Sequence, residues 1–187
     1  MTKAAVFIDK DGTLILDVPY NVDPAKIRLR AKAGPALRRL QTIGYELVLI
    51  SNQAGVAFGR FQESALDPVW SNLRAQLARE GVDLSAIYYC PHHPAGKVAE
   101  YVVDCECRKP RPGMLRRAAR ERRIDLQRSW MLGDILDDVE AGRRAGCRTV
   151  LLDVGSESEW RESPLRTPDF MARDLDAASR YIFASTP

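Results

Sequence analysis

Short, uninterrupted runs of apolar residues recur along the chain, and polar or glycine-containing segments separate them. Runs of this length that are rich in β-branched and aromatic residues are typical of strands buried on both faces of a sheet. The pattern predicts several such strands and a further short one near Phe170. The predicted buried strands are Val6–Ile8, Leu47–Ile50, Ala86–Tyr89, Trp130–Leu132 and Thr149–Leu152.

Segments with apolar residues at three- and four-residue spacing separate the strands and predict amphipathic helices. In the longest of them, Gln62–Glu80, the apolar residues from Leu66 to Leu77 fall on one face, although Pro68 weakens the pattern near its start. Glycine or proline marks most of the helix ends. The other predicted helices are Gly34–Ile43, Gly113–Arg123, Asp137–Ala145 and Leu175–Phe183.

This alternation of strands and helices predicts an α/β fold of three layers, with a parallel sheet between two layers of helices. The sequence shows no repeat, low-complexity segment or linker, and 187 residues are within the usual size of one domain. We therefore expect a single domain over residues 1–187, without a large cap domain. Ligands of such sheets bind beyond the carboxyl ends of the strands, so the side chains found there are the first candidates for a site.

Composition and charge disfavour several classes of partner. The chain is 45% hydrophobic and 28% charged, and its 28 basic and 25 acidic side chains leave a net charge of +3. So small an excess, with no basic stripe interleaved with aromatic residues, does not favour a nucleic-acid partner. No apolar run approaches the roughly 20 residues that span a bilayer, and the N-terminus runs directly into a motif rather than a leader. We expect a cytoplasmic protein without a membrane partner, and a monomer, since no long apolar stripe is left exposed.

Polar residues follow the ends of the predicted strands. Asp9 and Asp11 come after the first strand, Ser51 after the second and Asp134 after the fourth. Carboxylates that converge at one edge of a sheet would repel one another without a cation, and their hard oxygen atoms suit Mg²⁺. A carboxylate can be a covalent nucleophile toward phosphorus while a second one transfers protons. A serine hydroxyl and a cation such as Lys109 can hold the phosphoryl oxygens.

Singly, each of these residues is more often a turn, helix-cap or surface residue, so the hypothesis depends on their combination. Four motifs occur in order: Phe-Ile-Asp-Lys-Asp-Gly-Thr, Ile-Ser-Asn-Gln, Arg-Lys-Pro and Leu-Gly-Asp-x-x-x-Asp. Together they resemble the haloacid-dehalogenase-like (HAD) phosphohydrolases over roughly Val6 to Leu152. The resemblance implies a Rossmann-like HAD fold and a Mg²⁺-dependent phosphomonoesterase that acts through an aspartyl-phosphate intermediate.

The same resemblance implies a role for each motif residue. Asp9 would attack phosphorus and carry the phosphoryl group, and Asp11 would be the general acid and base. Ser51 and Lys109 would stabilise the phosphoryl group, and Asp138 would support the site without contacting the substrate. The implied Mg²⁺ ligands are Asp9, Asp11 through its backbone carbonyl, and Asp134.

Cysteine and histidine cluster between the third strand and the next helix. Three of the 4 cysteines and both of the 2 histidines lie between residues 90 and 107. Sulfur and imidazole suit tetrahedral Zn²⁺, and in a reducing compartment such a cluster indicates a metal rather than disulfides. We expect a structural zinc site that fixes this loop, with His93 the less favoured imidazole and Cys147 a buried small residue outside it. The alternative is a set of buried thiols beside a surface histidine pair. The expected zinc ligands are Cys90, His92, Cys105 and Cys107.

This loop narrows the resemblance to the zinc-containing branch of the HAD phosphatases. The branch includes D-glycero-D-manno-heptose-1,7-bisphosphate 7-phosphatases and histidinol-phosphate phosphatases, and the similarity to the heptose enzymes is the greater. It implies removal of the 7-phosphate from the heptose bisphosphate. By the same resemblance, the residues in contact with the sugar or its second phosphate would be Asp17, Tyr20, Asn52, Gln53 and Arg108.

One position departs from the heptose enzymes, which carry a basic residue directly after the motif aspartate. Here that position is Ile135, so a cation for the distal phosphate is missing and the preference for a bisphosphate stays open. Histidinol phosphate or another small phosphomonoester is the alternative substrate, and Glu106 or Glu100 could meet a cationic group on it. A phosphotransferase or mutase would pass the phosphoryl group to a hydroxyl instead of water. The alternative outside the enzymes is an inactive zinc-stapled binding module, which the intact motif residues disfavour.

Overall fold

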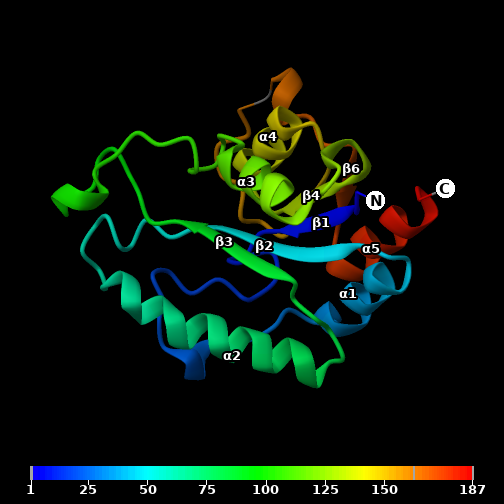
Figure 1. Cartoon of the computed structure of the whole chain (residues 1–187), viewed down its shortest axis with the longest axis horizontal. Helices are drawn as coiled ribbons and strands as arrows, with labels where there is room; N and C mark the ends of the chain where they lie inside the picture. The colour runs from blue at the N-terminus through cyan, green and yellow to red at the C-terminus, as the bar shows by residue number, and fades with distance from the viewer. Residues whose placement is uncertain (1, 162, 187) are drawn as a thin grey trace.

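A six-stranded parallel sheet forms the centre of the computed structural model, which describes residues 2–161 and 163–186. Met1 and Pro187, the ends of the predicted domain, lie outside the described residues. The strand order is β3-β2-β1-β4-β5-β6, so β1 has a neighbour on each side (Figure 1). The strands are β1 (Ala5–Ile8), β2 (Glu46–Asn52), β3 (Ala86–Cys90), β4 (Trp130–Gly133), β5 (Arg148–Leu152) and β6 (Phe170–Ala172).

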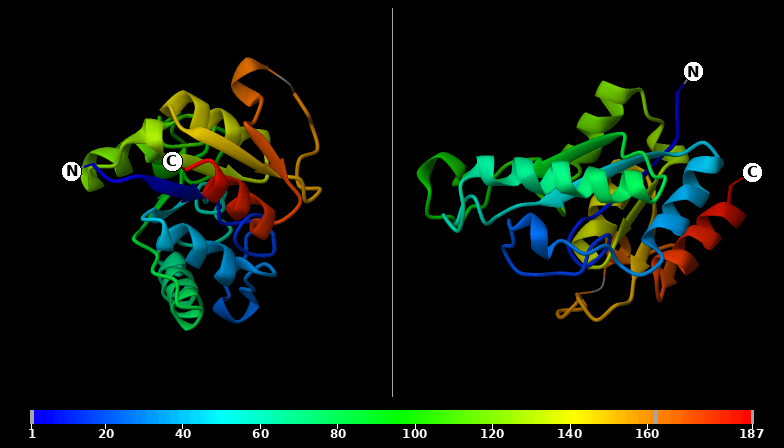
Figure 2. Two further views of the ribbon diagram at one scale, coloured as in Figure 1. Left: turned by 90° about the vertical axis from the view of Figure 1, so that its right-hand side faces the viewer. Right: turned by 90° about the horizontal axis from the view of Figure 1, so that it is seen from below.

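Helices cover both faces of this sheet, which confirms the predicted α/β layers (Figures 1 and 2). The helices on one face are α3 (Gly113–Arg122) and α4 (Leu136–Ala145). The helices on the other face are α1 (Ala33–Thr42), α2 (Leu66–Arg79) and α5 (Leu175–Ala184). Short 3₁₀ helices in the connections are η1 (Pro24–Lys26), η2 (Glu63–Ala65), η3 (Ala99–Tyr101), η4 (Leu126–Arg128) and η5 (Pro164–Arg166).

The uninterrupted apolar pattern of the strands follows from this double cover. Val6 and Ile8 of β1 point into the apolar cluster under α1, α2 and α5, whereas Ala5 and Phe7 point into the cluster under α3 and α4. All four residues are 0% exposed, because alternate side chains of a strand face opposite sides of a sheet and both sides are covered here. Complete burial of a side chain such as Phe7 stabilises the fold by about 1.5–3 kcal/mol.

Most predicted boundaries are confirmed to within one or two residues, and two differ in an informative way. Strand β2 continues to Asn52, so Ser51 is a strand residue paired with β3 and does not cap a helix. Helix α2 begins at Leu66 rather than Gln62, because the 3₁₀ turn η2 precedes it. Pro68 lies in the first turn of α2, where the missing N–H costs no helical hydrogen bond.

Two long connections lie at the carboxyl ends of the strands. One runs from β1 to α1, and the other, between β3 and α3, extends away from the sheet beside the start of α2 (Figure 1). Neither contributes a second sheet in the described part of the chain. None of the described helices combines the length and the apolar character needed to cross a membrane. Because all six strands run the same way, these connections and the strand ends meet at one edge of the sheet.

Candidate active site

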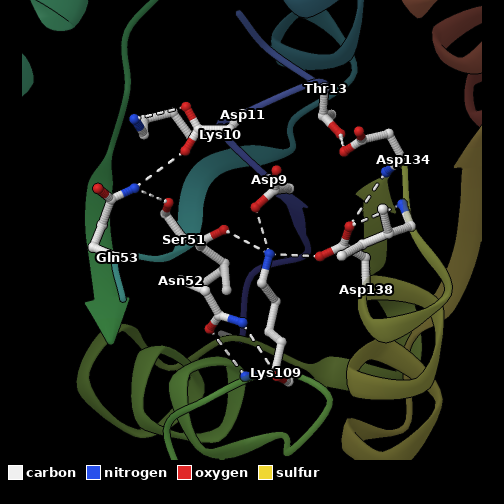
Figure 3. A network of polar contacts seen from close by, with 12 residues as sticks. Asp9, Lys10, Asp11, Thr13, Ser51, Asn52, Gln53, Lys109, Asp134 and Asp138 are labelled. Carbon is white, nitrogen blue, oxygen red and sulfur yellow. Dashed lines mark hydrogen bonds and ion pairs between the residues drawn. The ribbon is translucent and has the colours of Figure 1, made fainter. Parts of the chain in front are cut away.

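The ends of β2, β1 and β4 bring three of the predicted catalytic side chains together (Figure 3). Asp9 follows β1 directly, Asp134 follows β4, and Ser51 is the penultimate residue of β2. These strands are neighbours and parallel, so their carboxyl ends lie side by side. The three side chains are nearly inaccessible, with Asp9 7%, Ser51 1% and Asp134 4% exposed. Buried polar groups such as these need hydrogen-bonding or charged partners.

Lys109 lies at the centre of these side chains, although it comes from the loop before α3. Its Nζ donates to the carboxylates of Asp9 and Asp138 and lies 3.4 Å from the carbonyl oxygen of Ile50 (Figure 3). Lys109 is only 2% exposed. Burial alone would lower its pKa, but the Asp138 and Asp9 carboxylates together raise the pKa of Lys109. The ammonium group therefore stays charged beside the predicted nucleophile.

Asn52 fixes the main chain of Lys109. Its Nδ2 donates to the Lys109 carbonyl oxygen over 3.1 Å, and its Oδ1 accepts from the Lys109 N–H, also over 3.1 Å. Both polar atoms of the amide are thereby engaged. In the structure the Asn52 side chain therefore holds the backbone of the buried lysine, and Asn52 also lines the cavity described below.

Asp138 holds the other side of the lysine and is 0% exposed. Its Oδ1 accepts from Lys109, while its Oδ2 accepts from the N–H groups of Asp134 (3.2 Å) and Ile135 (3.3 Å) at the start of α4. These N–H groups have no partner within the helix. A Cβ at Gly133 would lie 2.1 Å from the Cβ of Asp138, so only glycine leaves room for the carboxylate. The Gly-Asp-x-x-x-Asp motif therefore uses its last residue both to cap α4 and to reach the lysine.

Asp134 is held by hydroxyl groups that sequence reasoning did not single out. Thr13 Oγ1 donates to its Oδ1 over 2.7 Å, and Ser156 Oγ, from the segment after β5, lies beside the same carboxylate. Gly12 has φ +81°, and a Cβ there would lie 2.0 Å from Asp134 Oδ2, so both its backbone and its surroundings require glycine. Thr13 belongs to the Asp-Lys-Asp-Gly-Thr motif and could have been found there. Ser156 carries no local signal.

The acid cluster has the donor chemistry of a divalent-cation site. Carboxylate oxygens of Asp9, Asp134 and Asp138 all lie within 4.8 Å of one another. Burial raises the pKa of Asp9, Lys109 opposes the rise, and the Asp138 and Asp134 carboxylates add to it. Burial and Asp138 likewise raise the pKa of Asp134. A hard cation would relieve this repulsion. Both oxygens of Asp138 are engaged, by Lys109 and by the N–H groups at the start of α4, whereas Asp9 accepts from Lys109 through Oδ1 and Asp134 accepts from Thr13 through Oδ1.

Asp11 turns away from the acid cluster toward a cavity of about 280 Å³. Its Oδ1 lies 2.8 Å from Lys10 Nζ, and its Oδ2 accepts from Gln53 Nε2 over 3.2 Å (Figure 3). The Gln53 amide also donates to Ser51 Oγ over 2.8 Å. Because Asp11 lines the cavity, its carboxylate can exchange a proton with a group bound there.

The cavity beside Asp11 is the candidate substrate site. Burial and the nearby Asp11 carboxylate raise the pKa of Asp17, which lines it. Glu106, Glu100 and Ile135 do not line this cavity. All five residues that the resemblance assigned to the substrate line the cavity. The lining residues are Lys10, Asp11, Asp17, Pro19, Tyr20, Asn21, Asn52, Gln53, Ala54, Gly55, Phe61 and Arg108.

The four cysteine and histidine side chains expected to bind zinc also lie together. Cys107 Sγ is 3.3 Å from His92 Nδ1, 2.9 Å from Cys105 Sγ and 3.0 Å from Cys90 Sγ. His93 lies outside this group, with its ring packed against an aromatic ring 4.7 Å away. Contact with the Cys90 thiol lowers the pKa of Cys107 to about 5. A thiolate is the form of cysteine that binds metals.

This cluster fixes the segment that carries the cations of the site. Arg108, which lines the cavity, directly follows Cys107, and its Nη1 lies 3.5 Å from the carbonyl oxygen of His92. Arg111 donates to the carbonyl oxygen of Cys105 over 2.9 Å. A metal ion held by the cluster would therefore order the loop on which the site arginine and lysine depend.

Comparisons with known proteins point to one family. A family model described as HAD-hydrolase-like matches residues 106–178. A D-glycero-β-D-manno-heptose-1,7-bisphosphate 7-phosphatase from Pasteurella multocida (strain Pm70) is 44% identical over 154 residues, which are 82% of this chain and 83% of that protein. The structure of a candidate HAD-like phosphatase from Mesorhizobium loti has a TM-score of 0.85 and 34% identity, and the match covers 98% of this chain and 86% of that one. The D,D-heptose 1,7-bisphosphate phosphatase from B. bronchiseptica, solved with magnesium and phosphate, has a TM-score of 0.80 and 28% identity, with 98% and 99% covered.

Proposed function

Because the chain belongs to the HAD-like hydrolases and, within them, to the family of heptose-1,7-bisphosphate 7-phosphatases, we propose that it removes the 7-phosphate from D-glycero-D-manno-heptose 1,7-bisphosphate. Its relatives place it among the phosphatases, so it is an enzyme. The observation that carries the proposal is the buried pair of Asp9 and Lys109, whose chain neighbours Lys10 and Arg108 line the same cavity as Asp11. Transfer of a phosphoryl group through an aspartyl phosphate uses a carboxylate nucleophile, a proton donor and a cation in such an arrangement.

The first half of the reaction transfers the phosphoryl group to the enzyme. The Asp9 carboxylate attacks phosphorus, and a bond forms between a carboxylate oxygen and phosphorus while the bond to the sugar oxygen breaks. Asp11 donates a proton to the departing sugar oxygen. The Lys109 ammonium and the Ser51 hydroxyl hold the phosphoryl oxygens as charge shifts among them, and both are already fixed by hydrogen bonds beside the nucleophile.

The second half returns the enzyme to its starting state. Water attacks the phosphorus of the Asp9 phosphate, and Asp11, now ionised, accepts a proton from that water. The bond between phosphorus and Asp9 breaks, and inorganic phosphate leaves. The position of the Asp11 carboxylate at the cavity suits both steps, because the sugar oxygen and the water occupy the same side of the phosphoryl group.

Mg²⁺ belongs to the same proposal, and it would neutralise charge on the phosphoryl group and the carboxylates when bound. The Asp9 and Asp134 carboxylates and the backbone carbonyl of Asp11 would hold it. The raised pKa of both carboxyl groups supports this, since oxygen atoms that repel one another favour a hard cation. The relative from B. bronchiseptica was solved with magnesium and phosphate.

Zn²⁺ is assigned to the cysteine and histidine cluster. The ligands would be Cys90, His92, Cys105 and Cys107, which bring together three sulfur atoms and one imidazole nitrogen. Four protein ligands leave no open position, so the metal would be structural. Protein purified without chelators should contain one zinc per chain by elemental analysis, and a chain without zinc at full activity would contradict this assignment.

The substrate assignment rests on the cavity. Lys10 and Arg108 are the cations on its wall, and among the described residues no carboxylate lies at hydrogen-bonding distance from Arg108. Arg108 would therefore meet the distal phosphate in place of the basic residue missing at Ile135. The sugar would lie against Asp17, Tyr20 and Gln53. A single domain over residues 1–187, a monomer and a cytoplasmic location stay predictions.

Steady-state kinetics with Mg²⁺ tests the proposal. We expect the highest kcat/KM for the heptose 1,7-bisphosphate, a lower value for the heptose 7-phosphate and the lowest for histidinol phosphate. The Asp9→Asn variant should lose turnover on every ester, because its amide cannot form the acyl phosphate. Asp83→Asn, at an exposed position, is the matched control and should behave as the unaltered enzyme does.

Each outcome has a distinct meaning. Equal and poor kcat/KM on all three esters would overturn the substrate but leave a phosphatase. The highest value on histidinol phosphate would favour the amino-alcohol alternative. Retained turnover in Asp9→Asn would overturn the mechanism.

A further inference from the structure

Lys10 stands between the two catalytic carboxylates in the sequence, yet its side chain serves only one of them. It is 2% exposed, as deeply buried as Lys109. Its Nζ lies 2.8 Å from Asp11 Oδ1, on the side of Asp11 away from Asp9 and Lys109 (Figure 3). The site therefore holds two buried lysines, one for each catalytic carboxylate.

Aromatic side chains fix the position of this second lysine. Its Nζ lies 5.6 Å from the centre of the Trp70 ring of α2, a cation–π distance. Trp70 in turn stacks on Tyr89 of β3, with ring centres 5.5 Å apart. A buried ammonium group is costly unless it is paired. The Trp70 ring therefore stabilises the charge of Lys10 in addition to the ion pair with Asp11.

Asp11 needs such support more than the other catalytic acids do. The Asp11 side chain is 33% exposed, whereas that of Asp9 is 9% exposed and Asp134 as a whole residue is 4% exposed. Lys10 holds its Oδ1, and Gln53 donates to its Oδ2 over 3.2 Å. Each carboxylate oxygen has two acceptor positions, so both contacts leave a free position for a transferable proton.

We infer that Lys10 is a positioning residue that orients the Asp11 carboxylate for proton transfer. The proton passes from Asp11 to the departing oxygen and later from water to Asp11, while Lys10 keeps its own proton throughout. Lys10 acts through Asp11 and leaves the phosphoryl oxygens to Ser51 and Lys109. The inference rests on the proposed function, because it takes Asp11 as the general acid and base.

A double-mutant cycle tests this on the full-length enzyme with Mg²⁺. The variants are Lys10→Met, Asp11→Asn and the two combined, with Lys26→Met as a control whose side chain is 67% exposed. Single turnovers with enzyme in excess follow the release of the leaving group from p-nitrophenyl phosphate and from an alkyl phosphate. This readout reports the first half of the reaction alone.

General acid catalysis contributes about 10²–10⁴-fold, so Lys10→Met should slow release from the alkyl ester by about 100-fold. Release of p-nitrophenolate, which needs little protonation, should slow far less, and the half-saturating ester concentration should stay nearly constant. In the Asp11→Asn background, Lys10→Met should have no further effect, because residues that act as one unit are not additive. Lys10→Arg, which keeps the charge and the donors, should restore most of the rate.

Other outcomes separate the inference from the proposed function. Three outcomes would overturn the role of Lys10 and leave that of Asp11. They are a double variant whose rate loss is the product of the two single losses, equal rate losses on both esters, and a change only in the half-saturating ester concentration. If Asp11→Asn releases the alkyl group at the full rate, the proposed mechanism fails and the inference fails with it. Thermal unfolding shows whether each variant is folded, and Lys10→Gln replaces Lys10→Met if the latter does not fold.

Discussion

Two clusters of ligand-type side chains lie at the same edge of the sheet, and they are held in opposite ways. The acid–lysine cluster comprises Asp9, Lys109, Asp134 and Asp138, and the cysteine–histidine cluster comprises Cys90, His92, Cys105 and Cys107. Every member of the first is buried and hydrogen-bonded to a neighbour on the sheet or at the start of α4. In the second only Cys90 is buried, and its members chiefly contact one another.

The difference follows from charge. Carboxylates out of contact with water must face a fixed counter-charge, so rigid strand ends and a capped helix hold them. Thiols and imidazole can be neutral before they bind a metal, so a half-exposed loop with no apolar core of its own can carry them. The acid–lysine cluster should therefore form with the fold, whereas the cysteine–histidine cluster should need its ion.

The largest effect is expected from Lys109→Met, which removes the counter-charge of the acid–lysine cluster. Loss of one partner of a buried ion pair typically costs about 3–5 kcal/mol, because the other charge stays buried without compensation. The free energy of unfolding, measured in urea without added Mg²⁺, should fall by about that amount, and turnover should be lost. Addition of Asp138→Asn should recover part of the stability but no activity. If Lys109→Met unfolds at the same urea concentration as the unaltered enzyme, the lysine does not stabilise the cluster.

A smaller effect on stability is expected from Cys107→Ser, which removes a ligand from the other cluster. Because the sheet does not depend on this loop, the far-ultraviolet circular dichroism should stay unchanged while bound zinc is lost. Misplacement of Arg108 and Lys109 should lower kcat/KM by about 10–100-fold, as is typical when the support of a metal site is altered. Cys147→Ala is the matched control, since Cys147 is buried in the apolar cluster near α4 and should leave zinc and activity intact. Full zinc content in Cys107→Ser would contradict the ligand set.

The smallest effect is expected at Glu46, at the opposite end of the sheet from both clusters. Its carboxylate lies 2.7 Å from both Lys3 Nζ and Arg122 Nε, and these cations hold the pKa of Glu46 below its ordinary value of 4.5 although burial alone would raise it. A carboxyl group with a lowered pKa stabilises the folded state above its ordinary pKa and loses that contribution as the pH falls through the folded value. Glu46→Gln should therefore reduce the free energy of unfolding by at most about 1 kcal/mol at pH 7, since the pairs are partly exposed.

That deficit should disappear in acid, where the unaltered protein is protonated as well, and kcat should not change at any pH. Urea unfolding of both proteins at several pH values between neutrality and acid measures the difference in the free energy of unfolding. A deficit that persists in acid would show that the ion pairs are not its cause.

The layers of the fold and part of the acid–lysine cluster can be predicted from the amino-acid pattern alone. Buried parallel strands are uninterrupted apolar runs, so β1 and the position of Asp9 at its end can be read from Val6–Ile8. Gly133 is also locally specified, because it makes room for Asp138 of its own motif, and Gly12 is specified by the positive φ of the turn after β1. The cysteine and histidine spacing likewise indicated the second cluster and its four members before any contact was known.

The contacts between residues of distant segments follow from tertiary packing and cannot be predicted from the sequence. Lys109 reaches Asp9 across 100 residues of sequence, and Asn52 holds the Lys109 backbone across 57. The pairing of Lys10 with Asp11, under the Trp70 ring of α2, gives no signal in the sequence beyond the presence of a lysine. Periodicity and spacing describe the faces of single elements, whereas partners from distant segments are chosen by how helices and loops pack over the strand ends.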